Sequence, residues 1–243
     1  MSQVQACCYS TEAVVDTILC RMTALIFDLD GTLVDSAPDI HAAVARMLVE
    51  EGAAPLSLQQ VRSFMGNGVP ALIARVMAAR GEPTDEARAA DLALRFLRQY
   101  EAVPVELTTA FPGAMEALAA LAAAGHRIGL CTNKPARAAH QVLAAFGIDH
   151  FFTAVHGGDT LAERKPHPAP LHATLRALGG EFAVYIGDSE VDAAAALAAG
   201  MPFLLYTGGY RKTPIEDLPH LGAFDHFNEL PGLIATLAHS ASH

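Results

Sequence analysis

Two kinds of hydrophobic pattern alternate along this chain, and together they predict its architecture. Short apolar runs without polar alternation predict buried strands; they lie at residues 24–27, 126–132, 153–156, 182–186 and 202–206. Between and after them, apolar residues recur every three or four positions and predict helices; these lie at 112–124, 136–146, 168–178, 191–199 and 230–238. Strands that alternate with helices predict an α/β fold, an open doubly wound parallel sheet (a Rossmann-like core) with helices on both faces.

The spacing of the first two strands predicts an insertion. Roughly ninety residues separate them, whereas a crossover needs only a dozen or two. The helix predicted at 112–124 is a sufficient crossover by itself, so the preceding residues are surplus to the sheet. We predict that residues 36–107 form an inserted α-helical cap and that residues 22–35 and 108–243 form the core. The cap helices are predicted at residues 40–50, 58–65, 69–80 and 85–100.

Residues 1–21 differ from the rest of the chain. They hold three of the four cysteines, show no clear period, and lack the basic start and long apolar centre of a secretion signal. We expect this N-terminal extension to be mobile or loosely packed.

Charge and composition exclude several classes of function. The 243-residue chain has a net charge of −10 and no basic run, which argues against nucleic acid as a partner. It has no apolar stretch near the roughly 20 residues that span a membrane. The cysteines form no C-x-x-C pair and the histidines show no zinc-ligand spacing, so we expect free thiols and a cytoplasmic location. No pattern sets an oligomeric state.

The candidate chemistry begins where the first strand ends. Asp28 and Asp30 are separated by one residue, so in an extended chain both carboxylates point to the same side. Two neighbouring carboxylates are unfavourable unless a cation or a shared proton compensates them. An ordinary Asp-Gly turn is the simple alternative. A calcium-binding EF-hand loop is excluded, because Gly31 comes at the fourth position and Leu33 occupies the sixth.

Other polar residues follow the later strands, and the carboxyl ends of parallel strands form the ligand-binding edge of such a sheet. Each of these residues has an ordinary structural explanation, such as a helix cap, a surface charge or a turn. Their coincidence at one edge favours a functional site. The residues are Thr132, Asn133, Lys165, Asp188 and Asp192.

The chain resembles the haloacid dehalogenase-like hydrolase superfamily from residue 22 to its end. The four motifs of that superfamily appear in order as DLDGT at 28–32, TN at 132–133, KP at 165–166 and GDSEVD at 187–192. Their fuller wording, with GNG at 66–68, TNKP at 132–135 and KPHP at 165–168, resembles the phosphoglycolate phosphatase branch. TGGY at 207–210 departs from it, since Tyr-Gly-Tyr is expected after the last strand.

This resemblance implies a Mg²⁺-dependent phosphatase that acts on a small phosphorylated metabolite, 2-phosphoglycolate above all. It implies that Asp28 is the nucleophile and a metal ligand. It implies that the Asp30 side chain is the general acid and base, and that the Asp30 backbone carbonyl binds the metal. Asp188 is implied as a further ligand, supported by Asp192. The phosphoryl group is expected at Thr132, Asn133 and Lys165, with Lys165 neutralising its charge.

The cap is expected to read the rest of the substrate. Backbone N–H groups at Gly66 and Asn67 could bind a carboxylate, although a turn between two helices is an equal explanation. Arg62 and Arg137 are further candidates for this role. A phosphatase or mutase for another small phosphate, such as a sugar phosphate or N-acetylmuramic acid 6-phosphate, stays open. A silent binding module is the alternative from another class, but it predicts loss of a core motif residue, and none is lost.

Overall fold

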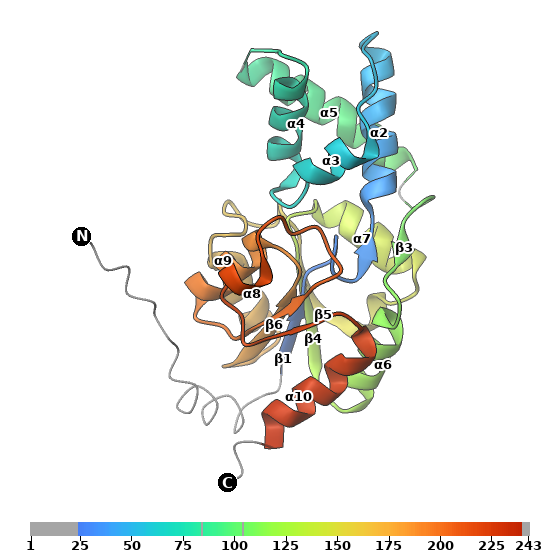
Figure 1. The fold of residues 1–243 in the computed structure, drawn as a ribbon. Coiled ribbons are helices and arrows are strands. Elements are labelled where there is room, and N and C mark those ends of the chain that lie inside the picture. The colour runs from blue at the N-terminus through green and yellow to red at the C-terminus, as the bar shows by residue number, and fades with distance from the viewer. Residues whose placement is uncertain (1–23, 84, 104, 240–243) are drawn as a thin grey trace, which may run out of the picture.

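The computed structural model describes residues 24–83, 85–103 and 105–239 (Figure 1). The N-terminal extension expected at residues 1–21 lies outside them. A six-stranded parallel sheet forms the centre, in the order β5-β4-β1-β6-β7-β8. Its strands are β1 (Ala24–Phe27), β4 (Arg127–Cys131), β5 (Phe152–His156), β6 (Ala183–Gly187), β7 (Phe203–Tyr206) and β8 (Gly222–Phe224).

The order of the strands places the candidate site. The chain winds outward from β1 through β4 to β5, then returns to β6 on the other side of β1 and continues to β8. The strand order therefore reverses between β1 and β6, and such switch points are where open α/β sheets bind ligands. Asp28 follows β1 and Asp188 follows β6, so both acids stand at this point.

Helices cover both faces of the sheet, which confirms the predicted doubly wound fold (Figure 1). In β1, Leu25 and Phe27 pack into the apolar cluster on one face, while Ala24 and Ile26 pack into the cluster on the other. The first cluster contains residues of α6 (Ala114–Ala123), α7 (Ala136–Ala145) and α10 (Leu230–His239). The second contains residues of α8 (Ala169–Ala177) and α9 (Glu190–Ala199). Burial on both sides explains why the strands read as unbroken apolar runs.

Four helices form a separate group above the carboxyl edge of the sheet (Figure 1). They are α2 (Ala37–Glu50), α3 (Leu58–Phe64), α4 (Gly68–Ala79) and α5 (Glu86–Ala102). Their apolar faces meet in a third cluster, to which the core contributes Ala138. Ser57 starts α3 with a reciprocal capping box to Gln60, and the Asp85 side chain caps α5.

The chain enters and leaves this helical group through one antiparallel pair of short strands. β2 (Val34–Asp35) pairs with β3 (Thr109–Ala110), with Asp35 opposite Thr109. Asp39, in the first turn of α2, is buried and accepts hydrogen bonds from the backbone N–H groups of residues 106, 107 and 108 at 2.8–3.2 Å. This carboxylate therefore fixes the exit of the helical group to its entrance.

Several predicted boundaries were wrong by one to three residues, and the short strands β2, β3 and β8 were missed. The helix expected from residue 112 begins at Ala114, because Gly113 adopts the left-handed conformation at φ +79°. The helix expected from residue 40 begins at Ala37, since Pro38 fits a first helical turn. β8 was missed because its three residues include a glycine and form no apolar run. No helix among the described residues is long and apolar enough to cross a membrane.

Candidate active site

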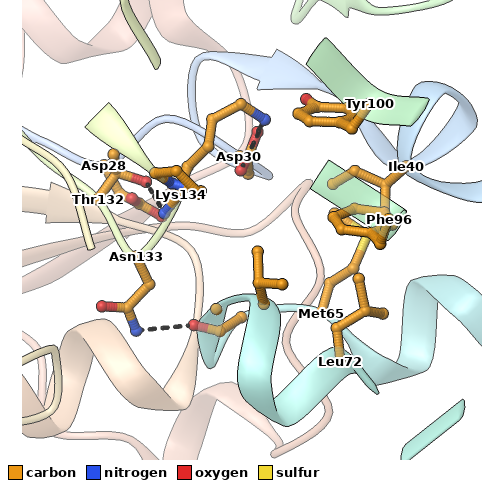
Figure 2. Close-up of a pocket in the computed structure, with 14 residues that line it drawn as sticks. Asp28, Asp30, Ile40, Met65, Leu72, Phe96, Tyr100, Thr132, Asn133 and Lys134 are labelled. Atoms are coloured by element: carbon orange, nitrogen blue, oxygen red, sulfur yellow. Dashed lines mark hydrogen bonds and ion pairs between the residues drawn. The ribbon is translucent and has the colours of Figure 1, made fainter. Parts of the chain in front are cut away.

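Asp28 and Asp30 stand where β1 ends, as the spacing predicted. The backbone N–H of Asp28 donates to the carbonyl of Ile186 at 2.9 Å, which extends the pairing of β1 with β6 by one residue. Asp28 is buried, whereas Asp30 is partly exposed. Gly31 follows at φ +89°, a conformation that L side chains rarely adopt, and turns the chain away from the sheet. Both acids line one cavity (Figure 2).

Lys165 reaches Asp28 from the segment that follows β5. Its ammonium lies 2.8 Å from Asp28 Oδ1 and 2.7 Å from Asp192 Oδ1. It also donates to the Tyr185 hydroxyl at 2.7 Å. Burial lowers the pKa of this lysine, but the two carboxylates outweigh it, so the net pKa is raised and the side chain stays charged. Lys165 therefore neutralises part of the charge of Asp28.

The side chain of Asn133 holds the backbone at Lys165. Its Oδ1 accepts from the N–H of Lys165 at 3.1 Å, and its Nδ2 donates to the carbonyl of the same residue at 2.9 Å. Nδ2 also donates to the carbonyl of Gly66, between α3 and α4, at 3.1 Å (Figure 2). The amide thus joins β4, the lysine segment and the helical group.

Asp188 and Asp192 complete the acidic cluster from β6 and α9. Asp188 accepts hydrogen bonds from the Thr32 hydroxyl at 2.9 Å and from the N–H of Tyr210 at 2.6 Å. Asp192 is the third residue of α9 and accepts from the Ser189 hydroxyl at 2.7 Å in a capping box. Asp28, Asp188 and Asp192 are all buried, and one oxygen of each lies within 4.8 Å of the others.

The charges of this cluster leave a deficit that a cation would fill. Three carboxylates face the one ammonium of Lys165, which leaves two negative charges, the charge of one divalent ion. Burial, only partly offset by Lys165, raises the pKa of Asp28 to about 6. Burial and the neighbouring acids Asp192 and Asp28 raise that of Asp188 well above its usual range. Buried carboxylate oxygens are ligands that hard divalent cations prefer, so the residues present fit such an ion.

Asp192 differs from the other two acids. Burial opposes its ionisation, but Lys165 and hydrogen bonds from Lys165, Ser189 and Tyr185 outweigh it and hold the pKa below its usual value. Its Oδ2 also accepts from the backbone N–H groups of residues 188 and 189. Because both oxygens already have donors, Asp192 is placed to orient Lys165 and the turn that carries Asp188.

The segment after β7 closes over Asp188. A Cβ atom at Gly209 would lie 2.2 Å from Asp188 Oδ2, so the backbone can approach the carboxylate only with glycine there. The Tyr210 hydroxyl donates to Asp35 Oδ1 at 2.7 Å. Tyr210 therefore connects the acidic cluster with the entrance to the helical group.

Of the remaining predicted residues, some line the cavity and others do not. Thr132 is buried in the cavity wall. Gly66 also lines the cavity, but the side chain of Asn67 is held by Arg75 at 2.7 Å. Arg62 pairs with Asp35 at 2.7 Å, and Arg137 is largely exposed and lies 3.3 Å from Glu101. Neither arginine lines this cavity.

Sequence reasoning missed Lys134. Its ammonium lies 2.9 Å from Asp30 Oδ1 and 4.7 Å from the centroid of the Tyr100 ring (Figure 2). Burial lowers its pKa, but Asp30 and Tyr100 outweigh it and raise the net value. The chain has only three lysines, at positions 134, 165 and 212. In so lysine-poor a chain, a lysine directly after Thr132 and Asn133 was a signal that could have identified it.

With this geometry established, comparisons with known proteins define the class. A model of the haloacid dehalogenase-like hydrolase family matches residues 25–206, so the chain belongs to that family and the resemblance seen in its motifs is confirmed. It is similar to several proteins named phosphoglycolate phosphatase. That of Cereibacter sphaeroides is 56% identical over 216 residues, which cover 89% of this chain and 99% of the relative. That of Rhodobacter capsulatus is 46% identical over 215 residues, or 87% and 96%.

Solved structures agree with the sequence relatives. The crystal structure of a predicted phosphoglycolate phosphatase from Haemophilus somnus superposes with a TM-score of 0.81 at 31% identity. The match covers 88% of this chain and 98% of that one.

Proposed function

We propose that this protein hydrolyses 2-phosphoglycolate to glycolate and phosphate with the help of Mg²⁺. The relatives that bear the name of this activity support the substrate. The observation that carries the chemistry is Asp28, a buried carboxylate beside the ammonium of Lys165 and the acids of a cation site. Asp30, two residues further on, lines the same cavity.

In the first step the Asp28 carboxylate attacks phosphorus. A P–O bond to Asp28 forms, the P–O bond to glycolate breaks, and Asp30 gives its proton to the departing glycolate oxygen. The repulsion between a carboxylate and a phosphate dianion is the main barrier. The Lys165 ammonium, 2.8 Å from Asp28 Oδ1, lowers this barrier. The products of this step are an aspartyl-phosphate and free glycolate.

In the second step water attacks the aspartyl-phosphate. Asp30, now a carboxylate, takes the proton of that water, phosphate leaves, and the Asp28 carboxylate is regenerated. The side chain of Asp30 is held for both steps by the Ser36 hydroxyl, which donates to it at 2.5 Å. Thr132 and the backbone of Asn133 hold phosphoryl oxygens in this scheme. The Thr132 oxygen accepts from the N–H of Lys134, which orients the hydroxyl and leaves donation to the phosphoryl group compatible with this contact.

Mg²⁺ would be held by the carboxylates of Asp28 and Asp188 and by the backbone carbonyl of Asp30. When bound, it supplies positive charge that offsets the carboxylate and phosphate charges at once. Asp192 supports the site through Lys165, Ser189 and the backbone before Asp188.

Affinity for Mg²⁺ should depend on pH in a defined direction. The pKa of Asp28 is raised from 3.8 to about 6, so the folded protein keeps a proton there that the unfolded chain releases. Protonation of Asp28 therefore stabilises the metal-free folded state relative to the unfolded chain as pH falls through 6. At low pH, Mg²⁺ must displace that proton in order to bind. We expect the apparent Kd for Mg²⁺, from melting-temperature titrations, to be about tenfold higher at pH 5 than at pH 7.5.

The direction of that change is the test, and Asp28→Asn is its control. The variant has no proton to lose at this position, so its Mg²⁺ titrations should differ less between the two pH values. Equal midpoints at both pH values in the unaltered protein would contradict a carboxylate ligand with a raised pKa.

The substrate is tested by phosphate release. We expect kcat/KM with Mg²⁺ to be several decades higher for 2-phosphoglycolate than for sugar phosphates or N-acetylmuramic acid 6-phosphate. Similar values across the panel would keep the mechanism and reject the substrate. Activity on none of them would favour a silent binding module.

A further inference from the structure

The proposed substrate carries a second charge that the phosphoryl-binding residues do not address. The cavity that contains Asp28 and Asp30 has one wall of apolar side chains from the helical group and another of polar residues from the segment after β4 (Figure 2). The apolar wall consists of Ile40, Met65, Val69, Leu72 and Phe96. A carboxylate enclosed there needs a cation or a hydrogen-bond donor, because burying it alone is strongly unfavourable.

Lys134 supplies that cation. Of the fourteen described residues that line the cavity, it is the one with a cationic side chain. The side chain is only 2% exposed, so its charge is little screened by solvent. The Tyr100 hydroxyl, contributed by α5, is buried and makes no geometrically defined hydrogen bond to a described residue. It is therefore a donor without an assigned acceptor, next to the ammonium.

The position of Lys134 matches the length of the substrate. Asp30 has to reach the oxygen that leaves with glycolate, and the ammonium of Lys134 is 2.9 Å from Asp30 Oδ1. In glycolate the carboxylate is attached to the carbon that bears this oxygen. A molecule whose leaving oxygen is at Asp30 thus places its carboxylate within reach of Lys134, which then exchanges part of its contact with Asp30 for the substrate.

The two arginines nearest the site are engaged elsewhere, and the remaining lysine is exposed. Arg62 pairs with Asp35, and Arg75 donates to the carbonyl of Phe64 and to the side chain of Asn67. Lys212 lines a second hollow beside Asp188 and Glu190. That hollow shares Asp28, Asp30 and Met65 with the cavity, but the Lys212 side chain is exposed, so solvent screens its charge.

We propose that Lys134, assisted by the Tyr100 hydroxyl, binds the carboxylate of the substrate and so determines the preference for a phosphorylated carboxylic acid. This inference rests on the proposed function and assigns its specificity to the segment after β4 and to α5 rather than to Gly66 and Asn67. Lys134 touches the substrate in this arrangement and takes no part in the transfer of the phosphoryl group.

The test compares three substrates of similar size that end in different charges. 2-Phosphoglycolate ends in a carboxylate, ethyl phosphate in a methyl group and O-phosphoethanolamine in an ammonium. For the unaltered protein we expect kcat/KM to fall in that order. In Lys134→Met we expect the ratio of 2-phosphoglycolate to ethyl phosphate to fall about 100-fold. The penalty against O-phosphoethanolamine should also disappear.

Further variants separate this role from a general effect on Asp30. If Lys134 acted only on Asp30, its replacement would lower kcat/KM for all three substrates equally and leave the ratio unchanged. That result would overturn the proposal. Lys134→Arg keeps the charge and should retain part of the preference. Tyr100→Phe, which keeps the ring in the apolar cluster, should lower the ratio about tenfold.

Lys212→Met is the matched control and should keep the ratio. If its ratio falls while that of Lys134→Met does not, the carboxylate is assigned to the wrong lysine. If Lys134→Met does not fold, the Tyr100→Phe ratio and the substrate order of the unaltered protein decide. If the unaltered protein shows no preference for 2-phosphoglycolate, the proposed function itself fails.

Discussion

Replacing Asp28 by asparagine should abolish phosphate release and leave the protein at least as stable. The amide cannot attack phosphorus, so we expect kcat to fall by about 10⁴-fold or more. The same change removes a buried charge whose pKa is raised to about 6, mainly by burial. We therefore expect the melting temperature without Mg²⁺ at pH 7.5 to stay unchanged or to rise.

The two readouts should move in different directions, which makes this variant informative. Asp225→Asn is the matched control, since this aspartate side chain is 69% exposed and lies outside the cavity. It should keep both activity and melting temperature. Turnover by Asp28→Asn above background would remove Asp28 from the role of nucleophile. A large drop in its melting temperature would instead show that the carboxylate stabilises the fold.

Replacing Lys165 by methionine should reduce both activity and stability. The variant leaves Asp28, Asp188 and Asp192 without the ammonium that faces them, and a buried ion pair that loses one partner costs about 3–5 kcal/mol. We expect a free energy of unfolding lower by about 3 kcal/mol in urea titrations without Mg²⁺. We also expect kcat to fall by about 10²–10³-fold, because the charge on the transferring group is no longer offset.

A double-mutant cycle shows whether the stability loss comes from the pair of Lys165 and Asp192. Adding Asp192→Asn to Lys165→Met removes one stranded charge and should restore part of the lost stability, so the two changes should not be additive. Lys212→Met, at an exposed lysine, should change neither stability nor kcat much. Additive effects of Lys165→Met and Asp192→Asn would contradict a coupled buried pair.

The fold could be predicted because its signals are local. The unbroken apolar runs of strands such as 183–187 and the intervals within the helices each lie inside a short stretch of chain. The two acids after β1 are also a local signal, since the alternation of a strand fixes their common direction. Asp188 and Lys165 could be placed because every parallel strand ends at the same edge of the sheet.

The parts of the site that the sequence did not predict depend on contacts between distant segments. Tyr100 has the pattern of one more apolar position in an amphipathic helix. Only the approach of α5 to the segment after β4 brings the centroid of its ring to 4.7 Å from the Lys134 ammonium. The dual role of Asn133 has the same cause, because its partners Gly66 and Lys165 lie 67 and 32 positions away. No pattern within a window of sequence records such pairs.

The pairing of β2 with β3 makes the helical group topologically separable. Residues 35 and 109 lie opposite each other, so the two ends of the inserted segment are neighbours across an antiparallel pair. A two-residue hairpin turn can join such ends without moving either strand. The order of the sheet does not depend on what lies between them, because all of its strands except β1 follow residue 109. A different segment could therefore replace residues 37–108 in evolution or in the laboratory, while Ser36, the same four acids and Lys165 remained in place beneath it.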